Sequence, residues 1–308
     1  MTGVARLAFL GTPDMAVPPL RALVDDGHDV ALCVTRPDRR RGRGSAVTPS
    51  PVKEAALELG IPVSHSMEDV ADAGVELAVV VAYGRIIPAA LLARVPMVNL
   101  HFSLLPRWRG AAPVERALLA GDEETGVCLM KLEEGLDTGP VYAHIVVPIG
   151  DTVDLPTLRE QLVTAGCALL IAALQHGMAG LPEPVPQSGE PTIASKLTSE
   201  DFRLQWEQPA AQLHRVVRLG RAWTTFRGKR LGILRATPVA APADAGSGAG
   251  GAGSAGVGPP GTLVGTVVCA GDGALALQEV QPESRGPMAA DDWARGVRIL
   301  AGERLGSD

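Results

Sequence analysis

The chain has 308 residues, of which 46% are hydrophobic and 20% charged, and its formal net charge is −6. This length exceeds what one hydrophobic core usually serves, so two domains are expected, and the composition argues against general disorder. No stretch approaches the roughly 18–20 consecutive apolar residues that span a bilayer, and the N-terminus lacks the apolar region of a signal peptide. The four cysteines are scattered, without the spacing of a metal site. We therefore expect a cytoplasmic protein with no metal and no membrane partner.

Short aliphatic runs alternate with helical stretches in the first half of the chain. The pattern predicts strands over 6–10, 29–35, 77–82 and 98–101, with helices over 18–26 and 51–59. Continuous apolar strands separated by helices indicate a parallel sheet that is covered on both faces. The first turn lacks the glycine fingerprint of dinucleotide-binding folds, and no phosphate-binding P-loop occurs. The first half is thus predicted to be α/β, without a nicotinamide cofactor.

The second half has a different texture. A helix is predicted over 155–176 and a Pro- and Gly-rich linker over 177–189, and short strands are then predicted over 230–235, 262–268 and 274–277. Short strands with turn signals indicate a small β-rich domain, consistent with a barrel. Residues 240–261 are nearly all Ala, Gly, Ser and Pro, which predicts a flexible insertion between two strands.

The negative net charge hides a local excess of positive charge. Residues 196–235 contain nine basic side chains and three acidic ones. Such an excess can be an electrostatic footprint for nucleic acid. A solvated basic surface fits the same composition and is favoured when charge is considered alone.

Three side chains between residues 99 and 137 suit acyl transfer to an amine. Asn99 and His101 end a predicted strand two residues apart, so both point to the same face, at the carboxyl edge where open α/β sheets bind ligands. Asn99 can donate a hydrogen bond to the oxyanion of a tetrahedral intermediate, and His101 can add a second donor or move a proton. Asp137, between two glycines, can accept the proton that the amine loses. Taken singly, each residue has an ordinary structural explanation, such as a capped turn for Asp137.

Longer motifs extend this pattern over nearly all of residues 5–150. They are Gly11-Thr12-Pro13-Asp14, Arg36-Pro37-Asp38-Arg39, Gly42-Arg43-Gly44, Pro49-Ser50-Pro51-Val52-Lys53, Val81-Ala82-Tyr83-Gly84, Asn99-Leu100-His101, Ser103-Leu104-Leu105-Pro106-Arg107-Trp108-Arg109-Gly110-Ala111-Ala112-Pro113 and Gly135-Leu136-Asp137-Thr138-Gly139. With these motifs the chain resembles the folate-dependent formyltransferases that act on a methionyl-tRNA. Ala194-Ser195-Lys196-Leu197 and Trp206 resemble the start of the C-terminal domain in that family.

The resemblance implies a function and a set of site residues. The implied reaction transfers a formyl group from 10-formyltetrahydrofolate to the amino group of methionyl initiator tRNA. It implies that Asn99, His101 and Asp137 are catalytic. It further implies a folate site at Ser103, Leu104, Leu105 and Pro106, and a tRNA contact through Arg36, Arg39, Arg40, Arg41 and Arg43. Arginine suits the tRNA contact because its planar guanidinium group binds phosphate and stacks on unpaired bases.

The resemblance also implies a fold. It predicts a Rossmann-like catalytic domain over 1–180, a linker over 181–194 and an OB-like β-barrel that helps to bind tRNA over 195–308, with the insertion at about 240–261. A monomer is expected.

Two rival functions stay open at this stage. The same three catalytic groups serve formyltransferases that act on sugar amines or on glycinamide ribonucleotide. The chain could instead bind folate or RNA without turnover, because Phe102 places a bulky ring beside His101 where the family usually has a small residue. The intact set of Asn99, His101 and Asp137 argues against the second function.

Overall fold

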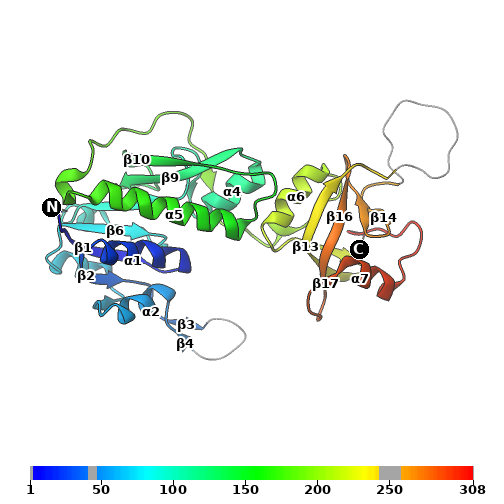
Figure 1. Ribbon diagram of the computed structural model, residues 1–308, viewed down its shortest axis with the longest axis horizontal. Helices are drawn as coiled ribbons and strands as arrows, with labels where there is room; N and C mark the ends of the chain where they lie inside the picture. The colour runs from blue at the N-terminus through cyan, green and yellow to red at the C-terminus, as the bar shows by residue number, and fades with distance from the viewer. Residues whose placement is uncertain (1–2, 41–46, 243–257, 308) are drawn as a thin grey trace. The chain divides into compact units, whose positions relative to one another are not determined.

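The computed structural model describes residues 3–40, 47–242 and 258–307. The chain divides into two compact units, shown in Figure 1 from blue to red. The first unit contains residues 1–116, 123–149 and 156–196, and the second contains residues 117–122, 150–155 and 197–308. The division into 1–180, 181–194 and 195–308 stays a prediction.

A seven-stranded sheet forms the centre of the first unit, in the order β10-β9-β7-β6-β1-β2-β5. Five strands are parallel: β1 (Arg6–Gly11), β2 (Asp29–Val34), β5 (Val63–Ser64), β6 (Leu77–Val81) and β7 (Met97–His101). Two further strands, β9 (Glu124–Lys131) and β10 (Val141–Pro148), extend the β7 side in antiparallel register. Every residue of β6 is buried, as expected for a strand covered on both faces. The predicted parallel sheet is confirmed, whereas the two antiparallel strands were not predicted.

Helices cover both faces of this sheet. Its helices are α1 (Val17–Asp25), α2 (Pro51–Glu58), α3 (Ala89–Leu92), α4 (Pro113–Ala120) and α5 (Leu155–Leu174), with 3-10 turns at Asp14–Ala16, Met67–Asp72 and Gly177–Gly180. Helix α2 begins where the sequence predicts, because the Ser50 hydroxyl accepts a hydrogen bond from the Lys53 amide at 3.0 Å and Pro51 occupies the first helical position. Two small sheets of two strands each complete the described part of the unit. They pair β3 (Arg39–Arg40) with β4 (Val47–Thr48), and β8 (Arg109–Gly110) with β11 (Ile193–Ala194).

Helix α5 is long and apolar enough to cross a membrane by length and composition alone. Its side chains Leu158, Leu162, Leu170 and Leu174 are fully buried within the protein. A core helix that packs on a sheet meets the same length and composition test, and α5 runs along the sheet in Figure 1. One side of α5 is therefore buried in the protein, as in a helix that packs on a sheet.

The second unit is built on an antiparallel sheet, in the order β12-β13-β16-β15-β14, with β17 paired to β16. Its elements are a 3-10 turn (Glu200–Phe202), α6 (Ala210–Arg218), β12 (Trp223–Phe226), β13 (Lys229–Val239), β14 (Leu263–Val264), β15 (Val267–Cys269), β16 (Ala274–Pro282), β17 (Met288–Ala289) and α7 (Ala290–Val297). Trp206 and Trp293 are 3% exposed in its core, where the Trp293 ring meets Phe226 edge to face at 5.1 Å. Most of the predicted insertion, residues 243–257, lies outside the described residues.

The C-terminal segment closes this sheet into a barrel. The Leu305 amide donates to the Gly261 carbonyl at 2.8 Å, just before the edge strand β14. The neighbouring Gly306 amide donates to the Thr225 carbonyl of the opposite edge strand, β12, at 2.9 Å. Both edges of the sheet are thus paired, which removes exposed strand edges. The predicted β-barrel domain is confirmed.

Candidate active site

Strand β7 places two of the three predicted catalytic residues at its carboxyl end. Asn99 lies opposite Val80 of the parallel strand β6 and opposite Met130 of the antiparallel strand β9. His101 is the last residue of β7. Because side chains alternate along a strand, Asn99 and His101 share one face of the sheet. Among the described residues, none hydrogen-bonds to the Asn99 side-chain amide, which is half-buried at this edge.

His101 and Asp137 form a pair. The His101 Nδ1 atom lies 3.6 Å from Asp137 Oδ2, and the two side chains are 6% and 13% exposed. The Trp108 carbonyl lies 2.9 Å from His101 Nε2, so one ring nitrogen meets the carboxylate and the other meets a main-chain oxygen. The backbone amide of Gly110 donates to Asp137 Oδ2 at 2.8 Å. A carboxylate held beside an imidazole in this way can orient the ring and exchange a proton with a bound substrate.

A tight turn between β9 and β10 presents Asp137. Asp137 itself has a φ of 51°, and the preceding Gly135 has a φ of 125°, a region that favours glycine. A Cβ at Gly139 would overlap the carbonyl oxygen of Lys131. The two flanking glycines are therefore needed for different reasons, one for its backbone angle and the other for close approach of two chain segments.

The loop after β7 folds back on the site. Ser103 is fully buried, and its hydroxyl donates to the Arg107 carbonyl at 2.6 Å. Leu104 lies over Gly126 of β9, where a Cβ would overlap the leucine side chain. Leu105 and Pro106 are half-buried and joined by a cis peptide bond. The Ser103 hydroxyl is thus used in a hydrogen bond within the loop. Leu104, Leu105 and Pro106 keep part of their surface accessible to solvent.

Phe102 points away from the catalytic pair. Its ring is 4% exposed, and a Cβ at Gly166 of α5 would lie 3.6 Å from the Phe102 Cε1 atom. Phe102 follows His101 directly, so alternation places it on the opposite face of the sheet, toward α5. The bulky ring therefore does not fill the space beside His101.

The segment 185–196, which is the last part of the first unit in sequence, contacts the site. Thr192 Oγ1 accepts a hydrogen bond from the Trp108 amide at 2.8 Å, and strand β11 pairs with β8 immediately before the helix α4. Gln187 donates to the carbonyl oxygens of Asp137 and Gly139, each at 2.8 Å. Sequence reasoning missed these contacts, because the stretch has the Pro- and Gly-rich composition of a linker.

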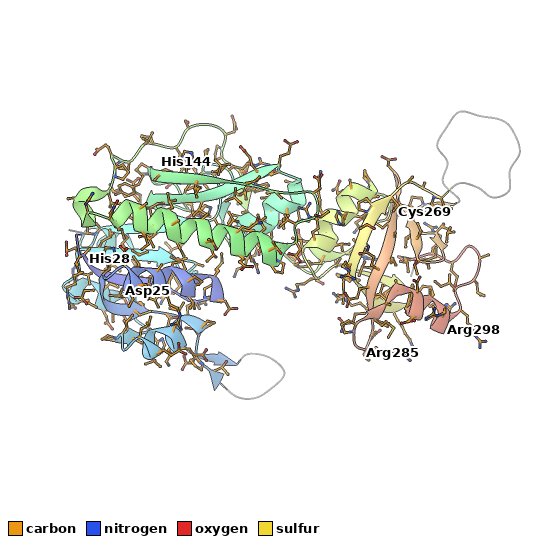
Figure 2. All side chains as sticks on the ribbon, in the orientation of Figure 1. Asp25, His28, His144, Cys269, Arg285 and Arg298 are labelled. Carbon is orange, nitrogen blue, oxygen red and sulfur yellow. The ribbon has the colours of Figure 1, made fainter. Side chains whose placement is uncertain are left out.

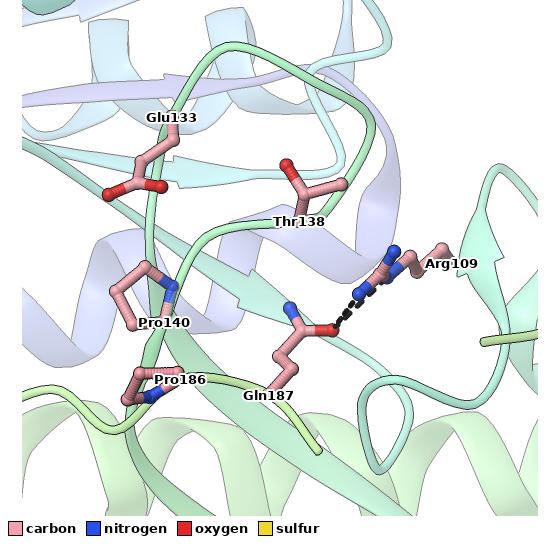
Figure 3. Close-up of a pocket in the computed structure, with 6 residues that line it drawn as sticks. All are labelled: Arg109, Glu133, Thr138, Pro140, Pro186 and Gln187. Carbon is pink, nitrogen blue, oxygen red and sulfur yellow. Dashed lines mark hydrogen bonds between the residues drawn. The ribbon is translucent and has the colours of Figure 1, made fainter. Parts of the chain in front are cut away.

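A pocket of about 340 Å³ opens next to the Asp137 turn (Figure 3). Figure 3 shows the Arg109 guanidinium joined to the Gln187 side-chain oxygen, with the remaining lining residues around them. The lining residues are Arg109, Glu133, Thr138, Pro140, Pro186 and Gln187. This pocket has the size of a small-molecule site and a mixed polar and apolar lining.

The arginine-rich loop leaves the sheet after β2. Its base is anchored twice, because Thr35 Oγ1 and Ser50 Oγ lie 2.7 Å apart and Lys53 Nζ lies 2.6 Å from Asp38 Oδ2. The backbones of Arg39 and Arg40 form β3, which pairs with β4 as a small hairpin. Arg36 is half-buried, and Arg41 and Arg43 lie outside the described residues.

Other reactive groups do not join the site. Burial raises the pKa of the Cys128 thiol to about 11 and that of Cys33 to about 12, so both thiols are neutral near pH 7 and are poor nucleophiles. His28 and His144 are labelled in Figure 2, beside α1 and in β10 respectively. Within the described part of the chain, no three His, Cys, Asp or Glu side chains gather in a way that could hold a metal ion.

The arrangement of Asn99, His101 and Asp137 can serve acyl transfer to an amine. The Asn99 amide provides a donor for a developing oxyanion, and the His101–Asp137 pair can take up a proton. The buried, neutral Cys128 leaves no thiol nucleophile beside them. The geometry therefore favours direct attack of an amine on an activated acyl group.

Comparison with known proteins agrees with this chemistry. Residues 5–174 match the formyl transferase family, and residues 196–298 match the formyl transferase C-terminal domain. The chain belongs to the formyl transferase family. A relative from Frankia casuarinae that is 45% identical, over 98% of this chain and 96% of that protein, is a methionyl-tRNA formyltransferase. These findings confirm the family resemblance that the sequence motifs indicate.

Solved structures share the fold at much lower identity. The N-formyltransferase from Helicobacter canadensis, in complex with folinic acid and dTDP-3-aminofucose, has a TM-score of 0.65 at 16% identity, over 89% of this chain and 99% of that chain. HypX from Aquifex aeolicus, in complex with tetrahydrofolic acid, has a TM-score of 0.63 at 17% identity, over 94% of this chain and 47% of that chain. The protein thus spans about half the length of HypX, and these two likenesses establish the fold.

Proposed function

We propose that this protein transfers a formyl group from 10-formyltetrahydrofolate to the amino group of methionyl initiator tRNA, in translation initiation. The observation that supports this most strongly is the His101–Asp137 pair, 3.6 Å apart at the end of the strand that also contains Asn99. The full-length relative, a methionyl-tRNA formyltransferase, supports the choice of acceptor. Its substrates are a folate and a tRNA.

The reaction follows from the three side chains. The amine nitrogen attacks the formyl carbon, and the oxyanion of the tetrahedral intermediate accepts hydrogen bonds from the Asn99 amide and from protonated His101. Asp137 receives the proton that the amine loses, directly or through water. The bond between the formyl carbon and the N10 atom of the folate then breaks, and N10 takes up the proton that Asp137 received, which restores the carboxylate. Formyl-methionyl-tRNA and tetrahydrofolate leave.

The folate lies against the loop after β7. Leu104, Leu105 and Pro106 are half-buried and supply apolar surface for the donor. Ser103 contributes by shaping the loop, because its hydroxyl already donates to the Arg107 carbonyl. The formyl group would then reach His101, two residues before the loop.

The arginine-rich loop binds the acceptor end of the tRNA through Arg36, Arg39, Arg40, Arg41 and Arg43. Its anchored base fixes where the hairpin starts. In the second unit, two arginines lie over the Trp223 ring, with the guanidinium carbons of Arg203 and Arg230 at 5.4 and 4.4 Å from its centroid. Arginines held over an aromatic ring form a cationic surface suited to phosphate and unpaired bases.

Replacing Arg39, Arg40, Arg41 and Arg43 by Ala raises the KM for methionyl-tRNA and flattens its salt dependence. Each phosphate that the protein no longer contacts keeps its counterions when the tRNA binds. The slope of log affinity against log salt therefore becomes shallower by about three. The measurement is KM as a function of KCl concentration. Replacing the exposed, carboxylate-paired Arg21 and Arg94 by Ala is the control, and leaves the slope unchanged. An unchanged slope in the loop variant would remove the loop from tRNA binding.

A sugar amine is the alternative acceptor. The Helicobacter canadensis enzyme shares the fold and was solved with an amino-sugar nucleotide. A direct competition separates the two functions: with 10-formyltetrahydrofolate, the protein formylates methionyl initiator tRNA and leaves an amino-sugar nucleotide unmodified. Formylation of the sugar alone would support the alternative.

Three further features of the chain belong to this proposal. The protein acts as a monomer, in the cytoplasm and without a membrane. Its catalytic domain spans residues 1–180, and residues 195–308 form the domain that helps to bind tRNA.

A further inference from the structure

The side chain of Gln187 uses both ends of its amide beside the catalytic pair. Its Nε2 group donates to the carbonyl oxygens of Asp137 and Gly139, each at 2.8 Å. Its Oε1 atom accepts from Arg109 Nε at 3.1 Å and from a terminal guanidinium nitrogen of Arg109 at 2.7 Å. These four contacts fix the orientation of the amide, because the nitrogen faces only acceptors and the oxygen faces only donors.

The contacts of Gln187 reach two groups beside the Asp137 carboxylate, one on the main chain and one on a side chain. One is the main chain of Asp137 itself, which has a φ of 51° and is costly to maintain without support. The other is Arg109, whose neighbour Gly110 donates its amide to Asp137 Oδ2 at 2.8 Å. Through the Arg109 side chain, Gln187 thus links the Asp137 turn to strand β8, whose Gly110 amide hydrogen-bonds the Asp137 carboxylate.

Gln187 does this without touching the reacting groups. Its hydrogen bonds go to main-chain carbonyls and to Arg109, and its side chain lines the pocket shown in Figure 3. The distance between His101 Nδ1 and Asp137 Oδ2, 3.6 Å, is longer than a hydrogen bond, so their contact depends on where the turn holds the carboxylate. Loss of the amide would free the turn, and a displacement of about 1 Å at a catalytic group can lower a rate about 100-fold.

We propose that Gln187 is a positioning residue for formyl transfer, which acts by holding the Asp137 turn against strand β8 at the correct distance from His101. This rests on the proposed function, since it assigns Gln187 a part in the same reaction. It also gives the segment 185–196 a role in the active site.

Two variants test this, Gln187→Glu and Gln187→Met. Glu has the same shape and still accepts from Arg109, but it cannot donate to the Asp137 and Gly139 carbonyls, and Met loses all four hydrogen bonds. We expect kcat at saturating substrates to fall about 10–100-fold in both variants, with KM for methionyl-tRNA and for the folate within about threefold of wild type. The melting temperature changes little. Gln281→Glu is the matched control, because that amide donates to the Arg285 carbonyl in the second unit, and it retains wild-type kcat.

A second comparison separates positioning from a general structural role. In the Asp137→Asn background, single-turnover rates are measured with and without Gln187→Glu. A residue that acts through the Asp137 carboxylate adds little further loss once that carboxylate is gone. The same fold loss in both backgrounds, an unchanged kcat in the single variants, or a loss confined to KM would each overturn the inference. A wild-type protein that formylates no methionyl-tRNA would instead overturn the proposed function.

Discussion

Replacing Asp137 by Asn lowers the kcat of formyl transfer by about 100- to 10,000-fold, the range typical for loss of a general acid–base group. Asn has nearly the same shape and can still accept the hydrogen bond from the Gly110 amide, which is 2.8 Å from Asp137 Oδ2. It has no negative charge, so it can neither take up the amine proton nor stabilise protonated His101. The expected result is a loss in kcat, measured by single turnover at saturating tRNA and folate, with folate binding largely intact.

Glu134→Gln is the matched control for this variant. Glu134 is an exposed carboxylate in the same turn, three residues before Asp137. Removing its charge alters the local field but leaves the catalytic pair in place, so kcat stays near the wild-type value. A near-normal rate in Asp137→Asn, with the control also normal, would remove Asp137 from the reaction.

His101→Ala produces the second large loss, about 100-fold or more in kcat. The His101 side chain is 6% exposed and contacts both Asp137 and the Trp108 carbonyl, so Ala removes a proton carrier and an oxyanion donor together. Because the two residues act as a unit, the double variant with Asp137→Asn is little slower than the slower single variant. The measurement is a double-mutant cycle of single-turnover rates.

The double-mutant cycle can also contradict this expectation. If His101 and Asp137 acted independently, the fold losses of the single variants would multiply in the double variant. Such multiplication would show that the 3.6 Å contact between them has no part in catalysis.

The sequence predicts the local part of the site well. Asn99 and His101 lie where the strand pattern places them, because a period of two fixes which side chains share a face. The glycines around Asp137 indicate a tight turn, and the structure gives it a φ of 125° at Gly135. The parallel strands were equally predictable, since their apolar residues are continuous in sequence.

Contacts between distant segments were less predictable. Strand β9 contains the buried polar residue Thr125, and β10 contains the exposed His144, so neither strand has the simple apolar pattern of the parallel strands. The hydrogen bonds of Gln187 and Thr192 join residues 48 to 84 positions apart, and nothing in their own neighbourhood indicates a partner. The Phe102 ring lies near Gly166 of α5, a neighbour that is 64 positions away in sequence and that nothing near Phe102 indicates.

Formylation of the methionyl amine is the central claim, and mass spectrometry of the reaction product tests it most directly. Methionyl initiator tRNA is incubated with this protein and 10-formyltetrahydrofolate. The aminoacyl group is then released from the tRNA, and its mass is measured. We predict a mass gain equal to one formyl group in place of one hydrogen on the methionyl amine, absent when the folate is omitted. An unmodified methionyl group after incubation with active folate would contradict the account.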